Sequence, residues 1–173
     1  MDFYDVVKTR FSVRAYEDRP VEREKLDRIL EAARLAPSAK NLQECCYVVV
    51  TDREKREQLI SAAAGQRFVG QAPVVIVCCS TGDKDSLMRC GHSRYTIDSG
   101  IAIEHLALAA AAEGLGSCWI GSFYPDQVRE ILNIPEDIEV VELLPIGYPS
   151  PEAQSVRGRK DIEEIVCYDT WSL

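Results

Sequence analysis

The sequence predicts a single globular domain of mixed α and β structure, extending from residue 1 to residue 173. Its length is sufficient for one sizeable core. A composition of 46% hydrophobic and 28% charged residues is typical of ordinary globular proteins. Segments with helical spacing of apolar residues alternate with short apolar runs of strand length. No internal repeat or shift of composition indicates a linker.

The first part of the chain predicts a helix, a strand and a second helix. Between residues 21 and 36, apolar side chains recur at helical spacing, and Pro37 ends the pattern. The run "CCYVVVT" (45–51) has no polar alternation, as in a strand covered on both faces. Thr51, with Glu54 three residues later, forms a capping box that opens the next helix.

The middle of the chain predicts a strand, a loop and a long helix. The apolar run 72–80 has strand length and carries Pro73 near its start. Residues 81–96 are polar and without clear period, which predicts a loop. The segment 97–113 is alanine-rich and apolar nearly all round, as in a buried central helix, and Gly114 is placed to end it.

Three further elements complete the predicted order. "GSCWIG" (116–121) has the pattern of a strand entering a turn. "YPDQVREILNI" (124–134) predicts a short helix that begins near its proline. "IEVVELLPIGY" (138–148) predicts a longer strand.

Charge and composition exclude several classes of protein. The net charge of -8 and pI of 4.9 argue against nucleic acid or an anionic membrane as the main partner. The N-terminus lacks the pattern of a secretory signal, and no apolar run approaches the ~20 residues of a membrane span. We therefore expect a cytoplasmic protein. The seven cysteines are expected to be mostly buried free thiols, because two adjacent pairs lie in strand-like runs.

Two short basic clusters stand out in this acidic chain. In an extended segment, Arg10, Ser12 and Arg14 share one face while Phe11 and Val13 point into the core. Two guanidinium groups and a hydroxyl are the donors that a phosphate group selects. The alternative for this stretch is a solvated polar edge. A second cluster sets Arg157 and Arg159 two residues apart; alone, it is equally compatible with an exposed loop.

Five blocks of sequence resemble the FMN-dependent nitroreductase family, in its short form. They occur in family order and span nearly the whole chain: "RFSVRAY" (10–16), "APSAKNLQ" (36–43), "LAAAAEGLGSCWIGSF" (108–123), "LLPIGYP" (143–149) and "RGRKDIEEIV" (157–166). The resemblance implies an α+β sandwich with a central mixed β-sheet surrounded by helices. It also implies an intertwined homodimer with FMN at the subunit interface.

The resemblance also implies roles for particular residues. The FMN phosphate and ribityl end would be held by five side chains: Arg10, Ser12, Arg14, Arg157 and Arg159. The other subunit would supply four residues along the flavin: Pro37, Ser38, Ala39 and Asn41. In the turn "WIGS", Trp119 and Ile120 would lie near the ring, and the backbone N–H groups of Gly121 and Ser122 would point toward flavin N5. No catalytic acid or base and no metal is implied.

The chain departs from the family pattern in three places. Glu44 and Cys45 stand where a proline and an aromatic residue are usual. Gly121 replaces an acidic residue that longer members often carry. The segment 81–96 is short beside the helical excursion that covers the flavin in long members.

Other polar residues invite weaker interpretations. Cys90 and His92 lack the further ligands of a metal site, although Cys90 is the first candidate for redox reactivity and His92 for contact with a substrate. Glu104 and His105 are interpreted as partnered polar residues of the core or an interface. Asp98 suits the start of a helix.

The sequence therefore predicts an oxidoreductase that carries electrons from NAD(P)H through FMN to nitroaromatic, quinone or similar acceptors by a ping-pong mechanism. Two alternatives are open from the sequence. One is an FMN enzyme of another reaction type, such as dehalogenation or heterocycle dehydrogenation. The other is a non-catalytic flavin-binding module that senses redox state.

Overall fold

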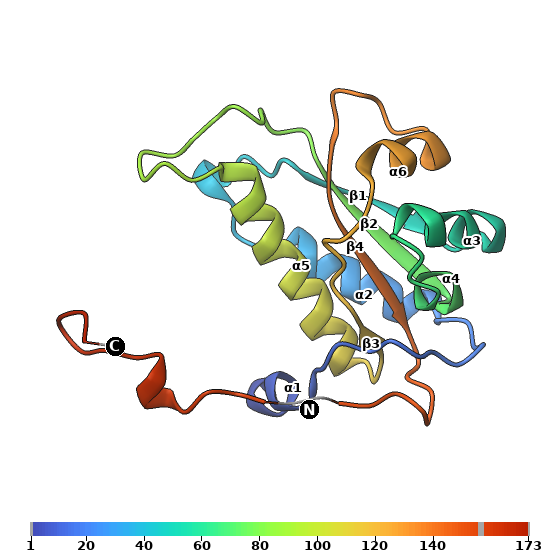
Figure 1. Cartoon of the computed structure of the whole chain (residues 1–173), viewed down its shortest axis with the longest axis horizontal. Helices are drawn as coiled ribbons and strands as arrows, with labels where there is room; N and C mark the ends of the chain where they lie inside the picture. The colour runs from blue at the N-terminus through green and yellow to red at the C-terminus, as the bar shows by residue number, and fades with distance from the viewer. Residues whose placement is uncertain (1, 156–157, 173) are drawn as a thin grey trace.

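The computed structural model describes residues 2–155 and 158–172. At its centre is a four-stranded sheet with the order β1-β2-β4-β3 (Figure 1). The strands are β1 (Cys45–Val50), β2 (Val74–Ser80), β3 (Gly116–Ser117) and β4 (Glu139–Gly147). All three pairings are antiparallel. The parallel component of the expected mixed sheet is, among the described residues, one isolated bridge between Ser12, outside the named strands, and Ser117 of β3.

Helices cover both faces of this sheet. They are α1 (Phe3–Thr9), α2 (Arg23–Arg34), α3 (Arg53–Ala62), α4 (Phe68–Gln71), α5 (Arg94–Ala112) and α6 (Pro125–Leu132), with 3-10 turns at Ala39–Asn41 and Ile162–Glu164. One core cluster joins α2 and α5 to Ile76 and Leu144 of the sheet. The other joins α3 and α6 to Val77 and Leu143. Neighbouring residues of a strand thus pack against helices on opposite faces of the sheet.

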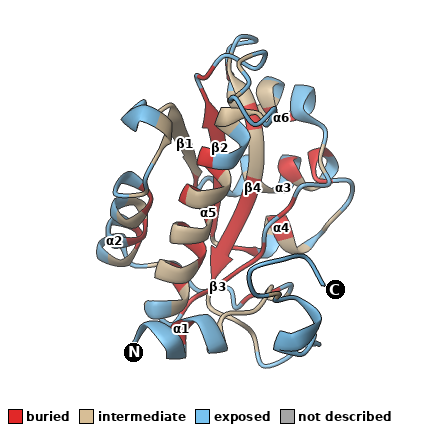
Figure 2. Cartoon of the chain, turned by 90° about the vertical axis from the view of Figure 1, so that its left-hand side faces the viewer, coloured by how far each residue is buried: buried red, intermediate tan, exposed pale blue. Residues whose placement is uncertain are grey.

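The central strands are buried because both of their faces are covered. Every residue of β2 is buried, and so are the last five residues of β4 (Figure 2). This explains the runs of apolar residues without polar alternation in these segments. The seven cysteines are thiols, with no disulfide among the described residues, and Cys78 and Cys79 face the two different clusters, as their adjacency predicted.

Several boundaries differ from those that the sequence predicts. The cap of α3 is Asp52 rather than Thr51, because the Asp52 carboxylate accepts the N–H of Lys55. Helix α5 begins at Arg94, earlier than predicted, and β3 is shortened to two residues. The sequence patterns did not reveal α1 or α4, which are too short to show a clear period.

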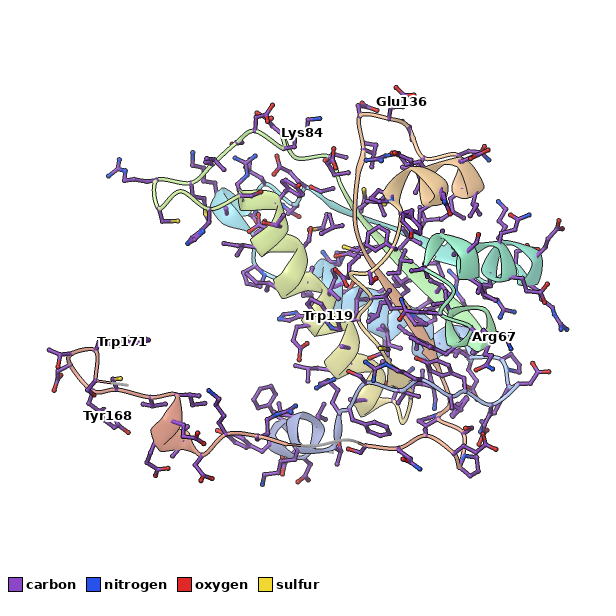
Figure 3. The ribbon with its side chains drawn as sticks, viewed as in Figure 1. Arg67, Lys84, Trp119, Glu136, Tyr168 and Trp171 are labelled. Carbon is purple, nitrogen blue, oxygen red and sulfur yellow. The ribbon has the colours of Figure 1, made fainter. Side chains whose placement is uncertain are left out.

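The C-terminal residues form an arm that leaves the body of the molecule. Figure 1 shows this segment running past α1 and away from the sheet. It carries the exposed side chains Ile162, Tyr168 and Trp171, of which Tyr168 and Trp171 are each 84% exposed (Figure 3). No helix among the described residues is long and apolar enough to cross a membrane.

Candidate functional site

The extended segment after α1 lies along the outer edge of β3. The Val13 N–H donates to the Ser117 carbonyl at 2.9 Å, and Ser12 is bridged to Ser117 in parallel. Gly116 permits this approach, because a Cβ there would overlap the Val13 side chain. The buried Tyr16 hydroxyl then donates to the carbonyls of Val13 and Pro145. The segment is therefore held against the edge strand β3 and its neighbour β4.

The predicted alternation of this segment is confirmed. Val13 is 1% exposed in the core, whereas the Arg14 side chain is exposed. The three predicted phosphate ligands of this segment, Arg10, Ser12 and Arg14, lie within electrostatic or hydrogen-bonding reach of Cys118. Burial raises the pKa of the Cys118 thiol; Arg14, a hydrogen bond with Ser12, and Arg10 act in the opposite direction. The three donors therefore converge on one small region at the edge of the sheet.

Arg10 is also held from α5. Its Nε lies 4.0 Å from the Glu104 carboxylate, and its side chain is 20% exposed. Glu104 is thus a partner of the basic cluster rather than half of an acid–base pair with His105. His105 faces α2 instead, with Nδ1 3.0 Å from the Ala32 carbonyl. Both residues are partnered polar groups, as the sequence predicted.

The turn that follows β3 leaves its outer edge open. Ile120 exchanges both backbone hydrogen bonds with Leu143 of β4. The alternation of an antiparallel pair then directs the N–H of Gly121 away from β4. Gly121 and Ser122 are exposed, and within the described residues neither N–H donates to a protein acceptor. Trp119 is 37% exposed beside them, and Ile120 is buried in the core.

Glu142 was not identified from the sequence, and it lies next to this turn. Because Ile120 pairs with Leu143, Gly121 stands opposite Glu142. A Cβ on Gly121 would lie 3.5 Å from Oε1 and 3.7 Å from Oε2 of that carboxylate. Burial raises the pKa of Glu142 to about 7. The signal in the sequence was one acidic residue inside the apolar run "VVELLP".

The second predicted block lies elsewhere on the same chain. Residues 37–41 form the connection from α2 to β1, and both carboxylate oxygens of Asp98 accept the N–H of Ala39 at 3.1 Å. Asp98 is 5% exposed, so its role is to hold this loop rather than to cap α5. Pro37 and Ser38 line a cavity of about 300 Å³, whereas Asn41 is exposed.

The two blocks are not brought together within one chain. Asp98 faces the loop 38–41 at the N-terminal end of α5, whereas the basic segment and β3 lie toward its C-terminal end (Figure 1). The C-terminal block does not join them either. Arg159 is exposed on the arm and donates to the carbonyl of Gly158. Arg157 lies outside the described residues.

A larger groove, of about 750 Å³, lies on the α3 and α4 side of the molecule. Arg53, Arg56 and Arg67 line it together with acidic side chains that offset their charge. Arg56 donates to the carbonyls of Gly70 and Ala72, so its guanidinium holds α4 in place. We therefore take the turn after β3 as the candidate functional site, because its N–H groups, which have no protein acceptor among the described residues, lie beside the cations of the basic segment.

The segment 81–93 is tied to the start of β1. Arg94 forms two hydrogen bonds with Glu44, and its Nη1 donates to Ser86. Cys90 and His92 are exposed in this segment. Among the described residues, no three His, Cys, Asp or Glu side chains are grouped as metal ligands.

Comparison with known proteins identifies the fold. The nitroreductase family model matches residues 7–73 and 60–148. A nitroreductase family protein from Clostridium difficile, of known crystal structure, is 35% identical; the match covers 99% of this chain and 100% of that chain, with a TM-score of 0.87.

Two named relatives match over most of this chain. An NADH dehydrogenase from Thermus thermophilus is 33% identical over 92% of each protein. An FMN reductase [NAD(P)H] from Bacillus subtilis is 32% identical over 80% of this chain and 62% of that protein. The extent of the family match and these identities lead to one conclusion: the chain belongs to the nitroreductase family.

Proposed function

We propose that this chain is an FMN-dependent oxidoreductase that transfers electrons from NAD(P)H to nitroaromatic, quinone or similar acceptors. The observation that carries the proposal is the convergence of Arg10, Ser12 and Arg14 on the edge of β3, next to a turn with unpartnered N–H groups. Membership of the nitroreductase family and the FMN reductase named among its relatives support it.

The residues at this site fit the chemistry of FMN. Arginine side chains and a hydroxyl are suited to binding a phosphate group. The acidic remainder of the chain would repel such a group. The exposed N–H groups of Gly121 and Ser122 suit an acceptor nitrogen or oxygen of a flavin ring. Gly121 adds no side chain that would obstruct such a ring. The proposed ligands on this chain are Arg10, Ser12, Arg14, Trp119, Gly121 and Ser122. Ile120, which is buried and paired with Leu143, would instead hold the turn in position.

In this proposal the protein binds and orients while the cofactor carries the electrons. FMN, when bound, supplies a two-electron carrier between NAD(P)H and the acceptor. Arg10 and Arg14 would hold its phosphate, with Glu104 fixing the position of Arg10. A ping-pong order follows if NAD(P)+ leaves before the acceptor enters the same cleft.

A homodimer would complete the site. Pro37, Ser38, Ala39 and Asn41 lie away from the basic segment of their own chain, so a second copy is needed to supply them. Arg157 and Arg159 are proposed to join the same site from the arm. Exposed apolar side chains are available for such an interface on α1 (Phe3, Tyr4 and Val7), on α5 (Ile97) and on the arm (Ile162, Tyr168 and Trp171).

The first experiment is the visible spectrum of the purified protein, recorded before and after FMN reconstitution. Anaerobic addition of NADPH or NADH should bleach the flavin bands, and menadione or a nitroaromatic should restore them. A protein that does not bind FMN after reconstitution would contradict the proposed site. Bound FMN that neither nucleotide reduces would favour a binding module or another electron donor.

The oligomeric state is tested separately by multi-angle light scattering. We expect a dimer for the full chain and a monomer, or a much weaker dimer, after truncation at residue 160. A monomeric full chain that binds FMN would contradict the shared site.

A further inference from the structure

A carboxylic acid, Glu142, lies beside the open turn of the proposed flavin site. Glu142 of β4 stands directly opposite Gly121, and its two carboxylate oxygens would lie 3.5 and 3.7 Å from a Cβ on that glycine. The pairing of Ile120 with Leu143 fixes this register. The carboxylate therefore lies at van der Waals contact distance from the place where a side chain at position 121 would begin.

Glu142 has no polar partner among the described residues. None of the ion pairs or side-chain hydrogen bonds in the described part of the chain involves its carboxylate. It is half-buried, yet neither of its oxygens is among the fully buried unpartnered atoms. A half-buried carboxyl that lacks a cation and retains access to the surface is suited to exchanging a proton.

The neighbouring groups do not offset the effect of burial on the pKa of Glu142. On β2 the opposite residue is Cys78, whose thiol pKa burial also raises. In the turn, Cys118 lies within electrostatic reach. The charged side chains at the N-terminal end of α5 have other partners. Arg94 pairs with Glu44, and Asp98 binds the loop at Ala39.

Two further arginines pair with carboxylates other than Glu142. Arg10 lies 4.0 Å from Glu104, and Arg129 lies 3.5 Å from Glu139 on β4. Burial raises the pKa of Glu142 to about 7, and no cation in the described part of the chain offsets this effect. A large fraction of Glu142 thus carries its proton at neutral pH.

We propose that Glu142 donates the second proton when the acceptor is reduced at this site. The proposal rests on the proposed function. A quinone takes two electrons and two protons to become a hydroquinone, whereas NAD(P)H supplies two electrons and one proton as hydride. The second proton leaves the Glu142 carboxyl for an acceptor oxygen, and the resulting carboxylate regains a proton from water.

The test compares wild type with Glu142→Gln, which keeps the shape and loses the acid. Each FMN-loaded protein is reduced with NADPH and mixed anaerobically with menadione in a stopped-flow instrument between pH 5 and 9. For wild type, we expect the rate of reoxidation to fall as pH rises through about 7. For Glu142→Gln, we expect a rate lower by on the order of a hundredfold below pH 7 and little pH dependence.

Two further variants separate chemistry from structure. Glu142→Asp keeps an acid and should restore part of the rate and the pH dependence. Glu136→Gln removes an exposed acid in the loop before β4 and should behave as wild type (Figure 3). The rate of reduction by NADPH and the affinity for FMN should be similar in all four proteins.

A readout without turnover is the infrared spectrum of the protein without FMN. A protonated carboxyl band should be present at pH 6, weaken as the pH rises through about 7 and be missing in Glu142→Gln. If NADPH and NADH fail to reduce wild type, the proposed function fails and this inference with it. If wild type is reduced, and Glu142→Gln retains its reoxidation rate and pH profile, only the inference is overturned.

Discussion

Arg94 and Glu44 join the segment 81–93 to the start of β1 through a two-point ion pair. Arg94 Nε lies 3.1 Å from Glu44 Oε2, and Nη2 lies 3.0 Å from Oε1. Their side chains are 17% and 20% exposed. Glu44 was one of the departures from the family pattern, and this pair gives it a structural role.

Arg94→Ala should loosen this segment without unfolding the core. Charge-assisted hydrogen bonds of this kind are typically worth about 1.5–3 kcal/mol, so amide exchange between residues 83 and 93 should accelerate by tenfold or more. Hydrogen exchange read by mass spectrometry measures the effect. Arg53→Ala is the matched control, because its ion pair with Glu57 is largely solvated. Unchanged exchange in Arg94→Ala would show that the pair does not order the segment.

Arg14→Ala should weaken FMN binding. Its guanidinium is exposed at the proposed phosphate position, and the loss of a charge-assisted bond worth about 1.5–3 kcal/mol corresponds to a tenfold or greater rise in Kd. Quenching of FMN fluorescence on binding provides the measurement. Arg23→Ala, on the exposed face of α2, should bind FMN as wild type does. Equal affinity in the two variants would remove Arg14 from the phosphate site.

Sequence patterns predicted the elements whose burial or alternation is visible in the local run of residues. The strands β1, β2 and β4 lie within the predicted segments, because contact with a core cluster on each face produces continuous apolar runs. The alternation of Arg10, Ser12 and Arg14 with Phe11 and Val13 was predictable for a similar reason, since period two is a local property of extended chain.

The remaining features depend on contacts between distant segments. The pairing of Gly121 with Glu142 depends on how the turn after β3 meets β4, so nothing near Glu142 in the sequence indicated its position. Asp98 was interpreted as a helix-terminus carboxylate, whereas it binds a loop 59 residues away in sequence. The helix α1 has only seven residues, several of them exposed apolar side chains, and no burial pattern.

Substitution by alanine should destabilise the protein at one glycine of the sheet edge and have little effect at another. In Gly116→Ala the new Cβ would overlap the Val13 side chain and displace the segment 10–14, at a cost of about 1–3 kcal/mol. In Gly121→Ala the new Cβ would meet only the Glu142 oxygens, at ordinary contact distance, so stability should change by less than about 0.5 kcal/mol. Urea unfolding of both variants tests this. Equal destabilisation would contradict the close packing at Gly116.

Glu142 should also make the stability of the protein depend on pH. Its pKa in the folded protein is about 7, above the value of about 4.3 expected in the unfolded chain. Between these values the folded state binds more protons than the unfolded state, so the free energy of unfolding should fall as pH rises from about 4.3 to about 7. Because the carboxylate is partly solvated, we expect the free energy of unfolding to fall by roughly 1 kcal/mol, which is less than the full pKa shift would give.

Urea unfolding of wild type and Glu142→Gln at several pH values isolates this contribution. The difference between the two proteins should grow in favour of Glu142→Gln up to about pH 7 and then level off, because Glu142 is ionised in both states above that value. Glu136→Gln should show no such trend, since that side chain is exposed. A constant difference between wild type and Glu142→Gln across this range would mean that Glu142 titrates normally in the fold.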